Sequence, residues 1–336
     1  MSILVTGAAG FIGSHVAKSL LEKGEQVIGL DIVNDYYDPT LKEARLVNLE
    51  HEHFCFERTD LCDVQRLNET FQRHNPTSVI HLAAQAGVRY SIENPRAYID
   101  SNVVGHFNIL EACRQHEIKH LVYASSSSVY GANKRVPFSE LDNVDHPVSL
   151  YAATKKSNEL MSHTYSHLFQ IPTTGLRFFT VYGPWGRPDM AYFSFTRKIM
   201  NGEPITVFNN GEMERDFTYI DDIVEGILLA LAHPPQLDRN ISVAPEGTIE
   251  HLAKAPYQIF NIGNNDPVPL ARFISAIEIA LGKSAIKVFE PMQAGDVPRT
   301  FADIDALGNT VGYQPSTSIE EGIQKFVDWY RTFYNA

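Results

Sequence analysis

The stretch Thr6-Gly7-Ala8-Ala9-Gly10-Phe11-Ile12-Gly13 decides the fold; it follows the apolar run Ile3–Val5 and opens an amphipathic segment. Its first glycine permits a tight turn, its second lets the backbone approach a pyrophosphate, and its third lets a helix pack closely on a strand. The first turn of such a helix offers free N–H groups and partial positive charge to an anion. The stretch therefore predicts a strand–turn–helix unit that binds a dinucleotide.

Outward from this stretch, short apolar runs alternate with longer segments of helical periodicity. We expect the apolar runs to form buried parallel strands, at Ile3–Thr6, Val27–Leu30, Ser78–His81, Leu121–Ala124 and Thr174–Arg177. Apolar residues recur every three or four positions in the helices expected between them, Phe11–Lys23, Val103–Arg114 and Tyr151–Phe169. Strands that alternate with helices of this length predict an α/β fold with a doubly wound parallel (Rossmann) sheet.

The pattern changes after residue 180, where prolines and glycines interrupt the periodicity. We expect residues 1–180 to form the Rossmann domain and residues 181–336 to form a smaller, loop-rich C-terminal domain that binds the substrate. Two later segments, 216–235 with helical periodicity and 258–263 with a strand pattern, are expected to return to the Rossmann domain.

Composition excludes several classes of protein. Of the 336 residues, 44% are hydrophobic and 20% are charged, which is ordinary for a globular protein and not for a disordered or fibrous one. The net charge is −12, from 28 Lys and Arg against 40 Asp and Glu, and the cations are scattered along the chain. We therefore expect no nucleic-acid partner.

The cysteines and the N-terminus indicate the compartment. Cys55, Cys62 and Cys113 form neither a pairable framework nor a metal-spaced cluster, so we expect a reducing compartment and no metal ion. The chain starts without a basic flank or cleavage site, and its most apolar helical segment is short and contains Glu225. We expect a cytoplasmic protein that does not associate with membranes.

Acidic residues at strand ends identify the dinucleotide. Asp31 ends the second expected strand, 18 residues after Gly13, where a carboxylate can hold the adenosine ribose hydroxyls. The same charge would repel a 2′-phosphate, so NAD is favoured over NADP. Asp60-Leu61 follows a further strand, expected between Val27–Leu30 and Ser78–His81 and thus third in the chain, where the acid could cap the adenine edge. For both acids, a solvated loop carboxylate is the alternative interpretation.

A tyrosine, a lysine and a serine run suggest proton-transfer chemistry. Tyr151 and Lys155 are four residues apart at the start of a helix, so their side chains share one face. A neighbouring ammonium favours the phenolate and lowers the pKa of a tyrosine from its usual value near 10. The run Ser125–Ser128 follows an expected strand, where its hydroxyls would face the cofactor. A polar turn that merely ends the strand is the alternative for this run.

Together these motifs resemble the extended short-chain dehydrogenase/reductases, through TGAAGFIG, Asp31, Asp60-Leu61, HLAA (His81–Ala84), SSSSVYG (Ser125–Gly131), YAATK (Tyr151–Lys155) and RDFTYIDD (Arg215–Asp222). The resemblance implies that the catalytic residues are Ser126, Tyr151 and Lys155, and that Lys155 also holds the nicotinamide ribose. It places Asn102 near the nicotinamide. The residues expected to bind NAD are Gly7, Gly10, Phe11, Ile12, Gly13, Asp31, Asn34, Asp60, Leu61, Leu82, Ala83, Ala84, Asn102, Tyr151 and Lys155.

Within that family the resemblance is greatest to NAD-dependent sugar-nucleotide epimerases, and among these to UDP-glucuronate 4-epimerases. It rests on NDYY (Asn34–Tyr37), QAGVRYS (Gln85–Ser91) and VYGPWGRPDMA (Val181–Ala191). Sugar-nucleotide dehydratases and decarboxylases of the family carry an acidic residue where this chain has Ser127 or Ser128. The resemblance implies interconversion of UDP-glucuronate and UDP-galacturonate through a 4-keto sugar, with the hydride removed from carbon 4 and returned to it.

Hydroxyls and arginines are candidates for binding the substrate. A 4-keto glucuronate is a β-keto acid that tends to lose carbon dioxide, so its carboxylate has to be held out of line with the ketone π-system. Short hydroxyl donors could do this, or could simply cap strand ends, and a guanidinium suits the diphosphate. The expected substrate-binding residues are Gln85, Arg89, Ser127, Ser128, Thr180, Arg187, Arg215 and Arg299, with Arg215 favoured for the diphosphate. Some family members have a further arginine at the position of Gln293.

Three other functions stay open at this stage. A neutral UDP-sugar (UDP-glucose, UDP-N-acetylglucosamine or UDP-xylose) could be epimerised instead, and UDP-glucuronate decarboxylation is disfavoured by the serine pair. A non-catalytic scaffold that binds NAD would not need the serine, tyrosine and lysine together. The resemblance also implies a homodimer, formed through the helices around Val103–Arg114 and Tyr151–Phe169, and a role in polysaccharide biosynthesis.

Overall fold

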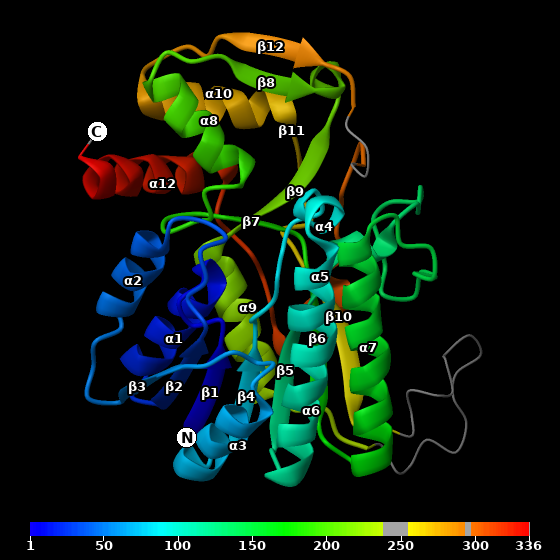
Figure 1. Ribbon diagram of the computed structural model, residues 1–336. Coiled ribbons are helices and arrows are strands. Elements are labelled where there is room, and N and C mark those ends of the chain that lie inside the picture. The colour runs from blue at the N-terminus through cyan, green and yellow to red at the C-terminus, as the bar shows by residue number, and fades with distance from the viewer. Residues whose placement is uncertain (238–254, 293–296, 336) are drawn as a thin grey trace.

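The structure, a computed structural model, describes residues 1–237, 255–292 and 297–335 (Figure 1). At its centre is a seven-stranded sheet of order β10-β6-β5-β4-β1-β2-β3, in which all neighbouring strands are parallel. Its strands are β1 (Ser2–Thr6), β2 (Gln26–Asp31), β3 (Phe54–Arg58), β4 (Ser78–His81), β5 (His120–Ser126), β6 (Thr173–Phe178) and β10 (Tyr257–Ile262). The doubly wound α/β fold predicted from the sequence is confirmed.

Helices cover both faces of this sheet (Figure 1). On one face, α1 (Phe11–Glu22) packs against α9 (Ile220–Ala232), and their apolar residues share one core cluster with β1. On the other face, α3 (Val64–His74), α6 (Gly105–Gln115) and α7 (Leu150–Phe169) enclose a second cluster. Both faces of the strands are therefore buried, which explains their continuous apolar runs.

The strand order reverses at the centre of the sheet. From β1 the chain proceeds to β2 and β3 on one side, and from β4 it proceeds to β5 and β6 on the other. In open α/β sheets, ligands bind in the crevice outside the carboxyl ends of the strands at such a switch point. The TGAAGFIG stretch follows β1 and the serine run ends β5, so both lie at this edge of the sheet.

A smaller part of the molecule lies over the carboxyl ends of the strands (Figure 1). It contains a three-stranded sheet, β11-β9-β7, and a two-stranded sheet, β12-β8. Its strands are β7 (Thr180–Tyr182), β8 (Ile205–Phe208), β9 (Glu214–Tyr219), β11 (Pro267–Pro269) and β12 (Lys287–Glu290). Its helices are α8 (Ala191–Met200), α10 (Leu270–Leu281) and α12 (Ile319–Tyr334), whereas α11 (Asp305–Val311) contacts β10 of the large sheet.

The expectation that this part is rich in loops is wrong. Helices α10 and α12 are 12 and 16 residues long, and each buries an apolar stripe that includes Phe273 and Phe326. Prolines and glycines here mark the ends of elements, as Pro269 does before α10 and Gly282 after it. In the sequence alone, these prolines and glycines look the same as those of an irregular chain.

The two segments singled out after residue 180 contact the large sheet. Helix α9 packs on β5 and β6, and β10 pairs with β6 from Tyr257↔Thr173 to Ile262↔Phe178. We propose that the Rossmann domain comprises residues 1–180 together with these two segments, and that the rest of 181–336 forms the substrate domain.

Shorter elements complete the described chain. A π-helical turn, η1 (Ile99–Val104), leads directly into α6 where the sequence predicted an ordinary helical start. The others are α2 (Pro39–Val47), α4 (Tyr90–Glu93), α5 (Pro95–Tyr98), η2 (Ser127–Tyr130) and η3 (Asn209–Gly211). Among the described residues, no helix is both long enough and apolar enough to cross a membrane.

Candidate active site

A cavity of about 1110 Å³ separates the carboxyl edge of the large sheet from the smaller part of the molecule. Its lining includes the TGAAGFIG stretch, the ends of β2, β4 and β5, the first turn of α7, and residues of the β7–α8 segment and β8. The lining includes every predicted site residue except Asn102 and Arg299. The volume suits a dinucleotide with a second ligand better than a single small molecule.

The glycine-rich stretch forms a backbone cradle at the cavity wall. Gly7 has φ +75°, a conformation that side chains disfavour, and a Cβ on Gly13 would come within 2.0 Å of the Gly7 carbonyl oxygen. Helix α1 begins at Phe11, and its N-cap, Gly10, provides no side-chain cap. The first N–H groups of α1 therefore stay available to a pyrophosphate, as the fingerprint requires.

Asp31 connects the end of β2 to this cradle. Its carboxylate accepts hydrogen bonds from the amides of Ala9 (3.1 Å) and Val33 (2.8 Å). Burial raises the pKa of Asp31, and the bond from the Val33 amide is the largest effect that opposes the rise. The acid both shapes the loop and faces the cavity, which fits a role at the adenosine ribose.

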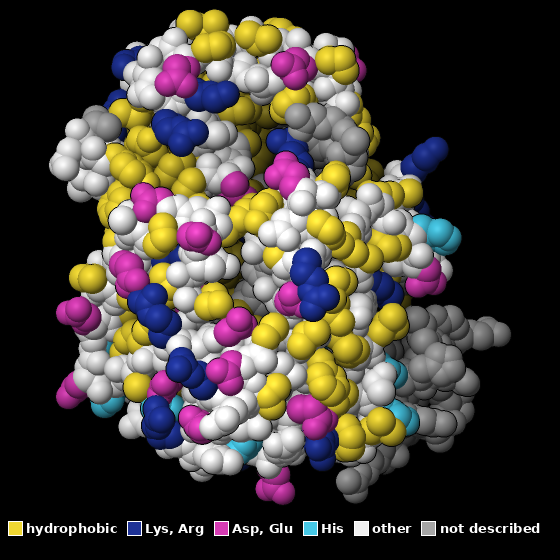
Figure 2. All heavy atoms as spheres, viewed as in Figure 1, with side chains coloured by type: hydrophobic (Ala, Val, Ile, Leu, Met, Phe, Trp, Pro, Cys, Tyr) yellow, Lys and Arg dark blue, Asp and Glu magenta, His cyan; other side chains and the backbone are white. Residues whose placement is uncertain are grey.

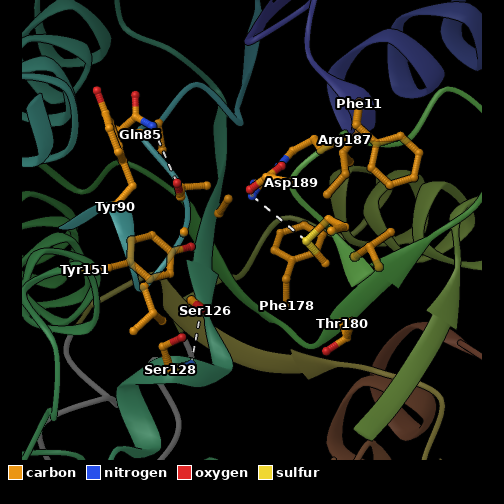
Figure 3. Close-up of a pocket in the computed structure, with 18 of the residues that line it drawn as sticks. Phe11, Gln85, Tyr90, Ser126, Ser128, Tyr151, Phe178, Thr180, Arg187 and Asp189 are labelled. Atoms are coloured by element: carbon orange, nitrogen blue, oxygen red, sulfur yellow. Dashed lines mark hydrogen bonds and ion pairs between the residues drawn. The ribbon is translucent and has the colours of Figure 1, made fainter. Parts of the chain in front are cut away.

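Ser126 and Tyr151 lie close together at another wall of the cavity (Figure 3), and Lys155 is part of the same lining. Ser149 caps α7 by accepting the Ala152 amide at 3.1 Å, which places Tyr151 and Lys155 on its first turns. Ser126, the last residue of β5, forms a hydrogen bond with Tyr151. The buried Lys155 ammonium donates to the Ala124 carbonyl at 2.9 Å.

The electrostatics of this group involve burial and a nearby arginine. Burial raises the pKa of Tyr151, while the hydrogen bond to Ser126 and the positive charge of Arg187 lower it. Burial lowers the pKa of Lys155 to about 8. Arg187, which the sequence assigned to the substrate, is therefore a cation that favours the Tyr151 phenolate.

Asn102 lies behind the cavity wall rather than on it. It is buried in η1, where its side-chain oxygen accepts the Gln85 amide (2.8 Å) and its amide donates to the Gln85 carbonyl (3.0 Å) and to Thr154 (3.1 Å). It thus ties the chain after β4 to α7, and Gln85 in turn lines the cavity.

The expected carboxylate-binding hydroxyls lie on two sides of the cavity. Figure 3 shows Ser126, Ser128 and Tyr151 on one side, and Thr180 and Arg187 on the other. The Ser128 amide donates to Ser126 Oγ at 3.2 Å, which caps the turn η2 and leaves the Ser128 hydroxyl toward the cavity.

The expected arginines have different surroundings. Arg215 lines the cavity and donates to the carbonyls of Glu214 (2.9 Å) and Pro298 (3.2 Å). Arg89 also lines it, 5.2 Å from the ring centre of Phe208.

Arg299 is not part of the cavity lining and forms an ion pair with Glu214 at 2.7 Å. It lies beside Arg215 in the fold, because Arg215 donates to the carbonyl of the neighbouring Pro298. Gln293 lies outside the described residues.

Sequence reasoning missed several residues of the lining. Tyr36 and Asp189 stood inside the quoted NDYY and RPDMA motifs, which gave a signal for both. Tyr90 likewise stood inside the quoted QAGVRYS motif, whereas Phe178 and Phe208 lie outside the quoted motifs and are brought to the cavity by the tertiary fold.

One cluster with metal-ligand chemistry lies outside the cavity. Among the described residues, Cys55, Glu57 and His74 have ligand atoms within 4.8 Å of one another, at the edge strand β3 and the end of α3. Glu57 is already paired with Arg73 (2.8 Å) and His74 (2.7 Å). None of the three lines the cavity, so the cluster belongs to the surface of the Rossmann part.

Comparison with known proteins identifies the family to which the chain belongs. Residues 3–244 match the NAD dependent epimerase/dehydratase family. The chain belongs to that family. It is 56% identical over 335 residues to Protein CapI of Staphylococcus aureus, with 99% of both chains covered. It is 52% identical over 336 residues to "Probable UDP-glucuronate 4-epimerase" of Rhizobium meliloti, covering 99% of this chain and 98% of that protein.

A solved structure of this epimerase family agrees with the fold. The UDP-glucuronic acid 4-epimerase from Bacillus cereus, in complex with UDP-glucuronic acid and NAD, superposes with a TM-score of 0.88 at 35% identity. The match covers 99% of this chain and 100% of that one. The resemblance to extended short-chain dehydrogenase/reductases is thereby confirmed, and NAD is the cofactor of the family.

Proposed function

We propose that this protein is an NAD-dependent 4-epimerase that interconverts UDP-glucuronate and UDP-galacturonate. The observation that carries the proposal is one cavity in which Ser126 and Tyr151 face Thr180 and Arg187 beside the glycine cradle. Such a cavity brings together a proton-transfer pair, a dinucleotide cradle and donors for an anionic sugar. The named relatives and the Bacillus cereus complex support the same substrate.

The residues of the cradle fit NAD. The α1 N-terminus and the glycine-rich loop would hold the pyrophosphate, Asp31 the adenosine ribose, and Lys155 the nicotinamide ribose. Bound there, NAD would supply hydride transfer from carbon 4 of the sugar and back to it.

Tyr151 and Ser126 act on the carbon 4 oxygen. Tyr151, as phenolate, takes the proton of the carbon 4 hydroxyl, and Ser126 holds that oxygen by a hydrogen bond. The sugar then turns about its anchored diphosphate and presents the other face of its ketone. Tyr151 returns the proton to the oxygen, so its own protonation state is unchanged over one cycle.

The hydroxyls around the sugar protect the ketone. We propose that Ser127, Ser128 and Thr180 hold the carboxylate so that its carbon–carbon bond stays out of line with the ketone π-system. Hydrogen bonds to a charged acceptor are stronger than neutral ones, so three short donors suit this task. Arg215, with Arg89, is proposed to anchor the diphosphate at the other end of the cavity.

We also propose a homodimer formed through the outward face of α6 and α7. Large apolar side chains are exposed on this face, including Phe107, Leu160, Leu168 and Phe169. Figure 2 shows apolar side chains running over these helices. A uronic-acid donor of the proposed kind suits polysaccharide biosynthesis.

The function is tested by incubating the purified protein with UDP-glucuronate and catalytic NAD⁺, and resolving the sugar nucleotides by chromatography and NMR. We expect UDP-galacturonate with no net formation of NADH. Turnover of only UDP-glucose or UDP-N-acetylglucosamine would refute the carboxylate clamp and leave the Tyr151 chemistry in place. A UDP-pentose and carbon dioxide would identify a decarboxylase instead.

A further inference from the structure

A buried arginine outside the cavity lining joins the cofactor side of the site to the substrate side. Arg45 lies on α2 with 1% of its surface exposed. Its guanidinium donates to the carbonyls of Ala9 (3.0 Å), Trp185 (3.1 and 2.6 Å) and Gly186 (3.2 Å), and to the Tyr37 hydroxyl (2.6 Å). None of these acceptors is a carboxylate. Its charge also lowers the pKa of Asp31 at the end of β2. A buried cation whose hydrogen bonds go to neutral oxygens is costly to desolvate, so stability alone does not explain this residue.

The segments that Arg45 connects belong to different parts of the molecule. Ala9 lies in the glycine-rich loop, whereas Trp185 and Gly186 form the turn between β7 and α8, 140 and 141 positions from Arg45 in the chain. Tyr37 precedes α2 and packs its ring 5.5 Å from the guanidinium carbon. Arg45 therefore fastens the β7–α8 turn onto the loop that cradles the cofactor.

The β7–α8 turn has a conformation that its own residues disfavour. Trp185 has φ +61°, in the left-handed region that costs free energy for a residue with a side chain. A Cβ on Gly186 would approach the Tyr192 hydroxyl to 2.0 Å, so the turn is packed tightly against α8. The Trp185 ring packs on Trp329 (5.2 Å) and Phe333 (4.9 Å) of α12. Such a turn persists only where surrounding contacts hold it.

The β7–α8 turn leads directly into Arg187, a cation of the site. Arg187 donates to Asp189 through Nε (3.0 Å) and Nη2 (2.6 Å). Asp189 also accepts a hydrogen bond from Tyr36, the neighbour of Tyr37, at 3.3 Å. Figure 3 shows Arg187 and Asp189 across the cavity from Tyr151. Any shift of the turn would therefore move Arg187 relative to Tyr151.

We propose that Arg45 is a positioning residue, which fixes the turn 185–187 to the glycine-rich loop and thereby fixes Arg187 relative to the cofactor and to Tyr151. The proposal rests on the proposed function, because two of its readouts follow the turnover of UDP-glucuronate. While carbon 4 is a ketone, the sugar must rotate within the cavity without leaving it. A loosened turn would hold the sugar less firmly, so the 4-keto sugar nucleotide would be released before its epimer forms.

The test replaces Arg45 by methionine, which keeps an unbranched apolar side chain and removes all donors. We expect kcat/KM for UDP-glucuronate to fall by about 100-fold, the scale of a 1 Å misplacement. The 4-keto sugar nucleotide released per epimer, measured by NMR after trapping, should exceed the wild-type ratio. Acrylamide should quench the fluorescence of Trp185 more strongly; the chain has only one other tryptophan, Trp329.

The controls separate positioning from stability. Arg58→Met removes an exposed arginine that pairs with Glu43 of α2 at 2.7 Å, and should leave all three readouts at wild-type values. Tyr37→Phe removes one acceptor of Arg45 and should shift the readouts in the same direction but less. Arg45→Lys retains the charge with fewer donors and should restore part of the activity.

Several outcomes would overturn the proposal. One is a wild-type ketone-to-epimer ratio and wild-type quenching in Arg45→Met. Another is a loss of activity no larger than the loss of folded protein. If Arg45→Met does not fold, wild-type readouts in both Tyr37→Phe and Arg45→Lys count against it. If the wild-type protein does not act on UDP-glucuronate, the proposed function fails by itself, and unchanged quenching in Arg45→Met then decides against Arg45 separately.

Discussion

At the scale of single residues, the proposed chemistry depends on the hydroxyl of Tyr151. The first prediction is that Tyr151→Phe lowers kcat by about 10³-fold or more, as expected for loss of a general base. The ring still packs beside Tyr98, 6.0 Å between centroids, so the fold and NAD binding should be retained. Turnover is measured by NMR and bound NAD by release on denaturation. Activity within a few-fold of wild type would remove Tyr151 from the scheme.

The second prediction concerns the pH dependence of the rate. Burial raises the pKa of Tyr151, so formation of its phenolate and the rate should increase as pH rises from neutral. Burial lowers the pKa of Lys155 to about 8, so above that pH the ammonium proposed to hold the nicotinamide ribose is lost and the rate should fall. Arginine stays protonated in this range.

Lys155→Arg should therefore move the alkaline limb of the kcat/KM profile to higher pH, whatever its effect on the maximum. An alkaline limb that stays in place would show that another group controls it. Lys156→Arg, on the same helix but outside the cavity lining, is the matched control and should leave the profile unchanged.

The residue types in the sequence were enough to predict the proton-transfer chemistry, but not the role of every residue around the cavity. Serine, tyrosine and lysine at their spacing, with the glycines and Asp31, all lie at one cavity. Two charges could not be assigned in this way. The effect of Arg187 on Tyr151 and the burial of Arg45 depend on a turn that meets the glycine-rich loop only in the folded chain.

At the scale of elements, the start of α1 is the part with the least freedom. The third prediction is that Gly13→Ala displaces the glycine-rich loop, because its Cβ would lie 2.0 Å from the Gly7 carbonyl oxygen. Overpacking of this kind typically costs about 1–3 kcal/mol. We expect weaker NAD binding by calorimetry and a lower free energy of unfolding. Lys18→Ala, on the exposed side of the same helix, should change neither by more than about 0.5 kcal/mol.

The fourth prediction concerns the ion pair that joins α7 to the sheet beneath the serine run. Glu159 accepts from Arg177 at 2.9 and 3.0 Å and from Ser125 at 2.6 Å, and the side chains of the ion pair are each 4% exposed. Glu159→Gln leaves the Arg177 charge buried without its partner, so the free energy of unfolding should fall by about 3–5 kcal/mol.

Urea denaturation measures this change, with Glu43→Gln as the control. Glu43 pairs with Arg58 at the surface at 2.7 Å, and exposed pairs contribute less than about 1 kcal/mol. Equal decreases in the free energy of unfolding for the two substitutions would show that the buried pair stabilises the fold no more than the exposed pair.

Elements were predictable where their pattern is local. Periodicity predicts the strands β1, β2, β4, β5 and β6, the helices α1, α6 and α7, and the later α9 and β10, but it gave no range for β3, α2 or α3. Two further features could not be predicted from the sequence. The π-turn η1 depends on the buried contacts of Asn102 with Gln85 and Thr154, and proline and glycine around α10 masked a regular amphipathic helix.

At the scale of the whole molecule, the site is completed by two parts that the sequence could only separate approximately. The Rossmann part supplies the glycine cradle, the serine run and Tyr151, and the smaller part supplies Arg215, Phe208 and the lining of β8 and α8. No residue pattern states how far apart these parts lie. Hydrogen bonds of Arg45 and Tyr36 help to set the distance between the two parts, because each residue bonds to the β7–α8 segment.

The last prediction concerns assembly. Phe107 packs edge-on against Tyr165 (6.3 Å), and Tyr165 against Phe169 (5.2 Å), so the apolar residues form a continuous surface across α6 and α7. A large exposed apolar surface is typical of an interface. If it forms the proposed homodimer, Leu160→Glu places a charge in its buried centre and should weaken the dimer by about 2 kcal/mol or more.

Sedimentation equilibrium over a range of concentrations measures the effect. Ile279→Glu is the matched control, since Ile279 is 77% exposed on α10, away from this face. Because the face lies outside the cavity lining, the monomeric variant should keep the ketone-to-epimer ratio of the wild type. A wild-type protein that sediments as a monomer, or a dimer that Leu160→Glu leaves intact, would show that this surface serves another purpose.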